Sequence, residues 1–197
     1  MTIIISIGKI ILLSCALVWF AVPTQAQEHL PDTVWSKQIQ NAQVVKFSPN
    51  GQYVFVGIDK IGSSVVYKIE TTTGTTVDTF RYHRPLTKRL SFSPTGDTLA
   101  VSGSGFIRLW DIRASDTIFT FEYGEEACIT PDGKRIIATT GKMGVDEPQI
   151  LVIDIETKEI IKSFIGRYNG ASNLQVSNDG KYFSFEDFRG TYGTVIL

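Results

Sequence analysis

Four short turn motifs recur along this chain, and their spacing constrains its fold more than any other feature. Each motif ends in a glycine that accepts a positive φ, and three of the four carry a proline that fixes φ at the bend. The four glycines stand 45, 37 and 47 positions apart. Turns of this kind join the two arms of a β-hairpin, so a hairpin recurs along the chain. The motifs are Ser48-Pro49-Asn50-Gly51, Ser93-Pro94-Thr95-Gly96, Thr130-Pro131-Asp132-Gly133 and Ser177-Asn178-Asp179-Gly180.

Short runs of β-branched and aromatic residues flank the turns, as strands covered on both faces require. Ile69, Ile112 and Ile155 end the third run of successive repeats, at two steps of 43 residues. That period is typical of a four-stranded propeller blade. Gly or Pro interrupts the runs before a helix could form. We therefore predict an all-β fold, a β-propeller of about four four-stranded antiparallel blades, at 44–80, 81–121, 122–164 and 165–197, with the outer strand of the last blade missing.

A further strand is expected before the first repeat, at residues 33–39. Its pairing with residues 194–197 would complete the fourth blade; the alternative is a leader that only crosses the surface. A four-stranded blade face covers roughly 300 Å², and its burial is worth on the order of 8 kcal/mol. An open arc with two bare end faces is therefore disfavoured. Three possibilities stay open: a ring closed by the N-terminal strand, a homodimer that shares end faces, and a truncated propeller without independent function.

Residues 1–26 have the pattern of an export signal. Lys9 precedes an apolar run at 10–22, and Ala26 supplies the small residue before an expected cut at Gln27. The run is shorter than the roughly 20 residues that span a bilayer, although residues 3–5 could extend it into a membrane anchor. We predict export to the periplasm or the medium, followed by a leader at 27–43 and no membrane insertion after cleavage.

Charge and cysteine content exclude two classes of interaction. The chain has 19 Lys and Arg against 20 Asp and Glu, and its net charge is −1. This balance gives no electrostatic case for nucleic acid or an anionic lipid surface as a partner. Cys128 is the only cysteine after the expected cleavage, so no internal disulfide can form.

Residues 83–121 carry a set of landmarks. His83 lies nine residues before Phe92, the Ser93 turn follows, and the third run ends in Leu109-Trp110-Asp111-Ile112. This pattern resembles the WD-repeat family of β-propellers. The resemblance implies structural roles for His83, Trp110 and Asp111 and a non-catalytic scaffold for protein partners. Complete repeats of that family carry a buried hydrogen-bonded set of His, Ser or Thr, Asp and Trp. Here the loop that should hold the Asp is one residue short, and the other repeats lack the His and the Trp.

Groups for catalysis are sparse. The only histidines are His29 and His83. Glu125-Glu126 and the acidic pair at 146–147 are adjacent residues, whose side chains point opposite ways in extended chain. No spacing resembles a zinc or calcium site, and Cys128 stands in an inner strand, where packing is expected. We therefore predict no enzymatic activity, no metal and no cofactor. The alternative is a small propeller hydrolase or lactonase with acids that face the channel.

The connections from one blade to the next supply the candidate binding face. Each carries a tyrosine beside charge, and Tyr and Arg are frequent anchors of protein interfaces. Ordinary loop composition is the alternative explanation. The connection at 141–149 is longer than its counterparts and could add specificity. We predict that an unidentified protein partner binds a face formed by Tyr82, Arg84, Tyr123, Glu125, Glu126, Arg167 and Tyr168.

Overall fold

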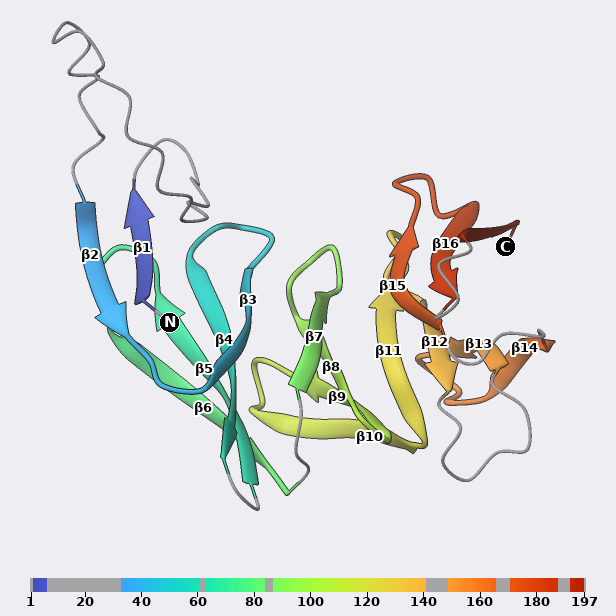
Figure 1. Ribbon diagram of the computed structural model, residues 1–197, viewed down its shortest axis with the longest axis horizontal. Coiled ribbons are helices and arrows are strands. Elements are labelled where there is room, and N and C mark those ends of the chain that lie inside the picture. The colour runs from blue at the N-terminus through green and yellow to red at the C-terminus, as the bar shows by residue number, and fades with distance from the viewer. Residues whose placement is uncertain are drawn as a thin grey trace, which may run out of the picture.

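The computed structural model describes residues 2–6, 33–60, 63–83, 87–140, 149–165, 171–187 and 192–196. The regular elements of these residues are all β-strands, which form five antiparallel sheets. Four of the sheets follow one another along an arc (Figure 1). The architecture confirms the predicted all-β propeller fold with repeated antiparallel blades.

Each strand of a blade pairs with the strand that follows it along the chain. Blade one has β3 (Ala42–Phe47), β4 (Tyr53–Lys60), β5 (Ser63–Glu70) and β6 (Thr76–Tyr82). Blade two has β7 (Thr87–Phe92), β8 (Thr98–Gly103), β9 (Phe106–Asp111) and β10 (Asp116–Glu122). Blade three has β11 (Gly124–Ile129), β12 (Arg135–Thr140), β13 (Gln149–Asp154) and β14 (Ile160–Ile165). Blade four has β15 (Ala171–Val176), β16 (Tyr182–Asp187) and β17 (Tyr192–Ile196).

A hydroxyl oxygen organises each turn between the first and second strands of a blade. In blade one, Ser48 Oγ accepts the backbone N–H of Tyr53 at 3.0 Å and donates to Asn50 Oδ1 at 2.8 Å. Gly51 has a φ of 69° and donates its N–H to Ser48 O at 2.9 Å. These bonds explain why each motif begins with a hydroxyl residue and ends with a glycine. The oxygens equivalent to Ser48 Oγ are those of Ser93, Thr130 and Ser177, at 3.0, 3.1 and 2.9 Å from the N–H they accept.

The hydrophobic core lies between neighbouring blades, because the sheets stack face to face. Phe80 of blade one meets Trp110 of blade two edge-on, with ring centroids 5.3 Å apart. Ile107 of blade two packs with Ile136 of blade three, and Ile137 of blade three packs with Phe183 of blade four. The turns also lie side by side: a Cβ added to the glycine of each of the last three turns would come within 3.6 Å of the proline of the turn before. The pairs are Pro49 and Gly96, Pro94 and Gly133, and Pro131 and Gly180.

The strand before the first blade, β2 (Thr33–Gln38), does not pair with β17. It pairs antiparallel with β1 (Thr2–Ser6), and both lie outside blade one (Figure 1). Trp35 fixes this position, since its Nε1 donates to Thr71 O at 2.6 Å and its ring lies against Gly74. Trp35 and Ile39 pack on the outer apolar face of blade one. The possibility that residues 33–39 close the ring is therefore not realised.

The two end faces of the arc differ in chemistry. One position on the second strand faces the next blade, and Phe55, Ala100 and Ile137 fill it in blades one to three with exposures of at most 1%. Ser184 fills it in blade four. Tyr182, on the same side of β16, is 44% exposed. An open arc with two bare end faces was expected to be disfavoured, yet the described sheets form an open arc (Figure 1). Its end faces are not bare apolar surfaces, because β2 covers the first and the described side chains of β16 on the last are polar or amphipathic.

The expected signal at 1–26 lies outside the described residues apart from β1, and its cleavage stays a prediction. Within the part of the chain that the structure describes, no helix has the length and hydropathy needed to cross a membrane.

Candidate functional site

Tyr123 alone forms the connection between β10 and β11. Its backbone has a φ of 68°, in the left-handed region, and its N–H donates to Gly105 O at 3.0 Å. Its side chain is 50% exposed. The next residue must be glycine, because a Cβ on Gly124 would lie 2.4 Å from the side chain of Ile107. The connection is thus held from both sides, and it presents an aromatic side chain to solvent.

Tyr82 occupies the equivalent position in blade one but is buried, with 2% exposure. Its hydroxyl is hydrogen-bonded to Thr87 Oγ1, and its ring lies 5.4 Å from that of Phe106. Asp59 completes this network, since its Oδ1 accepts the N–H of Thr87 at 2.9 Å, the Thr87 hydroxyl at 3.1 Å and the Ser64 hydroxyl at 3.0 Å. Burial raises the pKa of Tyr82 to about 12. Tyr82 therefore does not lie on the predicted loop face.

Glu125 and Glu126 belong to the inner strand β11 and to no loop. Lys88 Nζ lies 2.5 Å from Glu125 Oε2, and Arg89 Nη1 lies 3.2 Å from Glu126 Oε2. Glu126 Oε2 also accepts the N–H of Leu174 at 3.0 Å. These two carboxylates therefore link blades two, three and four, and neither is a free loop charge.

The residues with structural roles by resemblance do not form the buried set of a complete WD repeat. His83 is exposed. Trp110 is 7% exposed and packs on Phe80, but its Nε1 is buried without a hydrogen-bond partner. Asp111 Oδ1 accepts the N–H groups of Arg113 and Ala114 at 2.8 and 2.9 Å, which shapes the turn after β9. Arg84, Arg167 and Tyr168 lie outside the described residues, and their binding role stays a prediction.

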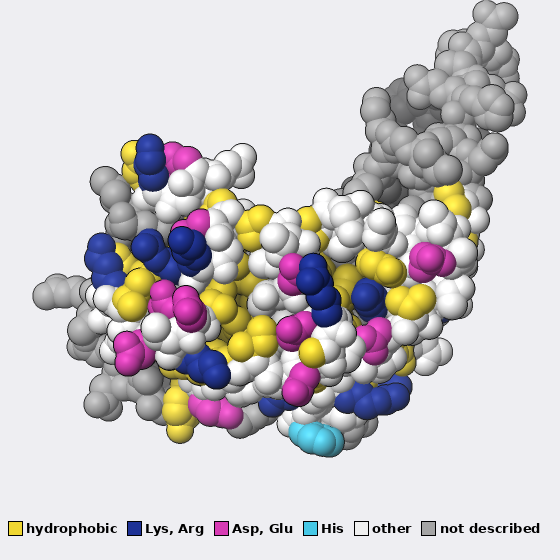
Figure 2. Space-filling view, turned by 180° about the vertical axis from the view of Figure 1, so that it is seen from behind, with side chains coloured by type: hydrophobic (Ala, Val, Ile, Leu, Met, Phe, Trp, Pro, Cys, Tyr) yellow, Lys and Arg dark blue, Asp and Glu magenta, His cyan; other side chains and the backbone are white. Residues whose placement is uncertain are grey.

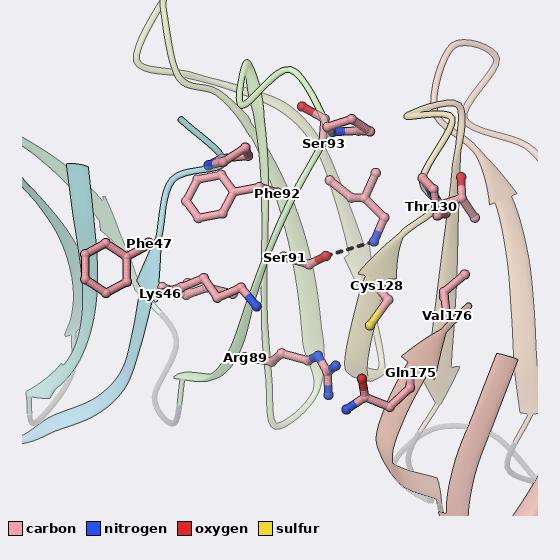
Figure 3. Close-up of a pocket in the computed structure, with 15 residues that line it drawn as sticks. Lys46, Phe47, Arg89, Ser91, Phe92, Ser93, Cys128, Thr130, Gln175 and Val176 are labelled. Atoms are coloured by element: carbon pink, nitrogen blue, oxygen red, sulfur yellow. Dashed lines mark hydrogen bonds between the residues drawn. The ribbon is translucent and has the colours of Figure 1, made fainter. Parts of the chain in front are cut away.

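A groove of about 330 Å³ runs along the first strands of the four blades (Figure 3). The prolines of the first three turns line it, so it reaches the turn end of these strands, away from Tyr123. Ser91 Oγ accepts the N–H of Ile129 across it at 3.0 Å. The polar and charged side chains of the groove include those of Lys46, Arg89, Ser91, Cys128 and Gln175.

Cys128 is a packed thiol in this groove. It is 6% exposed, and its Sγ donates to Leu174 O at 3.2 Å. Burial raises the pKa of the Cys128 thiol, which keeps it protonated near neutral pH. Its described environment therefore disfavours the thiolate that nucleophilic chemistry needs. Among the described residues, no group of three or more His, Cys, Asp and Glu side chains could hold a metal ion.

Sequence reasoning missed Asp59 and Lys46. Asp59 stands in the hairpin between β4 and β5, which is longer than the β8–β9 hairpin. The resemblance to the WD-repeat family is carried by blade two, so the Asp of the buried set was not expected in blade one. Lys46 stands where the other blades have Ser91, Cys128 and Gln175, and an alignment of the inner strands on their turn motifs reveals the difference.

Comparisons with known proteins agree with this architecture. Residues 74–111, which comprise β6 to β9, match the family described as WD domain, G-beta repeat. Comparison with curated proteins gives no match. Among solved structures, the crystal structure of RRP9 WD40 repeats aligns with a TM-score of 0.66 and 11% sequence identity, over 82% of this chain and 52% of that one. The chain thus spans about half the length of that structure, and the likeness concerns the fold. The chain carries a WD repeat within a β-propeller fold, as the resemblance in its sequence implies.

Proposed function

We propose that this chain is an exported, non-catalytic scaffold that binds a protein partner on the face of the blade connections, with Tyr123 as an anchor. The conformation of Tyr123 carries the proposal. A residue other than glycine in the left-handed region costs on the order of 1 kcal/mol or more, and such strain is concentrated at functional sites. The strained residue here is the whole of a one-residue connection, and its aromatic ring is half exposed.

The WD repeat and the propeller fold support a role in protein interaction. Tyrosine suits such a role, because it buries a large area at low entropic cost while its hydroxyl stays hydrogen-bonded. On the face shown in Figure 2, basic and acidic side chains are interspersed with hydrophobic ones. A surface of this kind suits a protein partner better than a polyanion.

Export rests on the sequence of residues 1–26, where Lys9 is followed by an apolar run and Ala26 precedes the expected cut. The N-terminal sequence of the protein recovered from the extracytoplasmic fraction tests this part. A start at Gln27 supports it, and retention of Met1 in the cytoplasm contradicts it.

Capture from the extracytoplasmic fraction, compared between variants, tests the binding face. Tyr123→Asn keeps the backbone conformation, because asparagine tolerates the left-handed region, but removes the ring. We expect it to lose at least tenfold of the partner that the wild type retains. Tyr182→Thr removes, from blade four, the other tyrosine that is strongly exposed among the described side chains, and it serves as the control. Unchanged capture by Tyr123→Asn would exclude this anchor.

A screen of esters and lactones, with and without chelator, tests the absence of catalysis. Turnover by the wild type above the background rate, and above all turnover that needs a metal, would replace the scaffold with the propeller hydrolase.

A further inference from the structure

The junction between blades one and two lacks hydrogen-bond acceptors that the next junction has. Between blades two and three, Ser91 Oγ accepts the N–H of Ile129 at 3.0 Å, and Ser102 Oγ accepts the N–H of Ala127 at 3.1 Å. These two hydroxyls satisfy N–H groups on the side of β11 that faces away from β12, since N–H groups of an antiparallel strand alternate in direction.

Strand register identifies the equivalent residues one blade earlier. Phe47 pairs with Val54 in blade one, as Phe92 pairs with Leu99 in blade two. By this alignment Lys46 and Gly57 stand where blade two has its two serines. The N–H groups of β7 that correspond to the capped ones belong to Leu90 and Phe92, and no described side chain accepts from either. Lysine has only donors, and glycine has no side chain.

A side chain at Gly57 would have to displace its neighbours before it could supply the missing acceptor. A Cβ at Gly57 would lie 2.7 Å from Val44 Cγ1 and 2.9 Å from Thr87 Cγ2. Asp59 of blade one accepts the N–H of Thr87 at the start of β7. For the N–H of Phe92, the residue of blade one that matches Ser91 is Lys46, whose ammonium group cannot accept.

The charges around this edge add to its donor character. The charged residues that line the groove near β7 are Lys46 and Arg89, and Glu126 contacts Arg89. Glu126 is already shared between Arg89 and the N–H of Leu174. Lys46 is exposed, and within the described residues it makes no ion pair and no side-chain hydrogen bond. Lys46 therefore directs one positive charge toward Ser91 in the groove (Figure 3), and Leu90 and Phe92 of β7 line the same groove.

We propose that this edge of the groove binds a carboxylate, with Lys46 as its charged contact and the N–H groups of β7 as further donors. The positive charge of Lys46 and the N–H groups of Leu90 and Phe92 select this ligand, because charge-assisted bonds from N–H groups to carboxylates are strong. The carboxylate belongs to an acidic segment of a protein or to a free small dicarboxylate. The site lies at the turn end of the inner strands, so it is separate from the face around Tyr123 and does not depend on it.

Titration with a fluorescent tetraglutamate peptide, followed by anisotropy, tests the site on the whole chain. A tetraglutamine peptide is the uncharged match, and glutarate competes as the free carboxylate. We expect binding of the glutamate peptide that weakens as salt rises, and at least tenfold weaker binding of the glutamine peptide. Displacement by glutarate assigns the site to small carboxylates as well, and lack of displacement assigns it to acidic peptide segments.

Lys46→Ser installs in blade one the hydroxyl that Ser91 supplies in blade two. It removes the charge and caps the N–H group, so we expect at least tenfold weaker binding of the glutamate peptide. Lys46→Met removes the charge alone and should also weaken binding, by a smaller factor; it replaces Lys46→Ser if that variant does not fold. Lys88→Met is the matched control, because Lys88 is already paired with Glu125. Equal binding by wild type and Lys46→Met, or equal binding of the two peptides, would overturn the proposal.

Discussion

Blades one and two carry a tyrosine at the same position of the fold, and the two side chains lie in opposite environments. Tyr82 is buried at 2% exposure and Tyr123 stands out at 50%. The preceding hairpin makes the difference. In blade one it extends to Lys60 and Ser63, so Tyr82 can pair with Ser64 and continue the strand. In blade two β9 begins at Phe106, and no strand residue is left for Tyr123 to pair with.

Hairpin length thus decides whether a tyrosine stabilises the fold or becomes available for binding. The longer hairpin also carries Asp59, which holds Thr87 and Ser64 around the buried hydroxyl of Tyr82. In the shorter hairpin, Gly105 O accepts the N–H of Tyr123 instead and holds its left-handed backbone. The same position within the blade therefore has a structural role in blade one and a candidate functional role in blade two.

Truncation of Tyr82 and of Tyr123 to alanine should give the largest difference in the free energy of unfolding. Tyr82→Ala leaves a cavity between blades one and two, and we expect it to lower the free energy of unfolding by about 4 kcal/mol. Tyr123→Ala removes a ring that packs on little, and we expect a change within about 0.5 kcal/mol. Urea unfolding followed by tryptophan fluorescence measures both. Similar losses for the two variants would contradict the comparison.

Removal of the Asp59 carboxylate should cause the next largest loss in the free energy of unfolding. Asp59→Ala leaves three donors without an acceptor in a largely buried site, and we expect a loss of about 3 kcal/mol. Asp59→Asn keeps one acceptor oxygen and is the control, with a loss of about 1 kcal/mol. Equal unfolding midpoints for Asp59→Ala and wild type would show that this network does not hold Tyr82.

The buried hydroxyl predicts a loss of stability in alkali. The pKa of Tyr82 is raised from 10.0 to about 12 by burial, so the protonated phenol is favoured in the folded chain. Its contribution is complete below pH 10 and disappears as the pH rises towards 12, a loss of about 2 to 3 kcal/mol. Unfolding curves between pH 9 and 12, an interval set by this pKa, should show that loss in the wild type and a smaller one in Tyr82→Phe. An identical decline in both would assign the effect to other groups.

Relief of backbone strain at Tyr123 should give the smallest change in the free energy of unfolding, and this change should be an increase. Tyr123→Gly removes the steric conflict of a left-handed residue, and we expect a gain of about 1 kcal/mol in thermal or urea unfolding. The matched change Tyr82→Gly, in regular strand, should destabilise strongly. A loss of stability in Tyr123→Gly would mean that the ring contributes to packing.

Local chemistry explains how much of the fold could be predicted. The turn hydroxyls, the prolines and the glycines with positive φ act within a few residues, so their repetition predicts the blades. The position of β2 depends on contacts of Trp35 with Thr71 and Gly74, which lie 36 and 39 positions away in the sequence. No local sequence pattern predicts contacts over such a separation.

The site was harder to predict for the same reason. Composition places a tyrosine beside charge in each blade connection, but exposure depends on the length of the hairpin before it. Glu126 reads as a loop charge in sequence, whereas its contacts with Arg89 and Leu174 come from two other blades. The inner-strand position of Lys46 becomes informative only when Ser91, its equivalent in blade two, is seen to cap a backbone N–H group.

Iodination of tyrosines, read out by peptide mass spectrometry with and without bound partner, tests the central claim most directly. We expect Tyr123 to be modified in the free chain and protected in the complex, and Tyr82 to remain unmodified in both. Modification of Tyr82 in the free folded chain would contradict the buried network. Equal modification of Tyr123 with and without partner would contradict its role as the anchor.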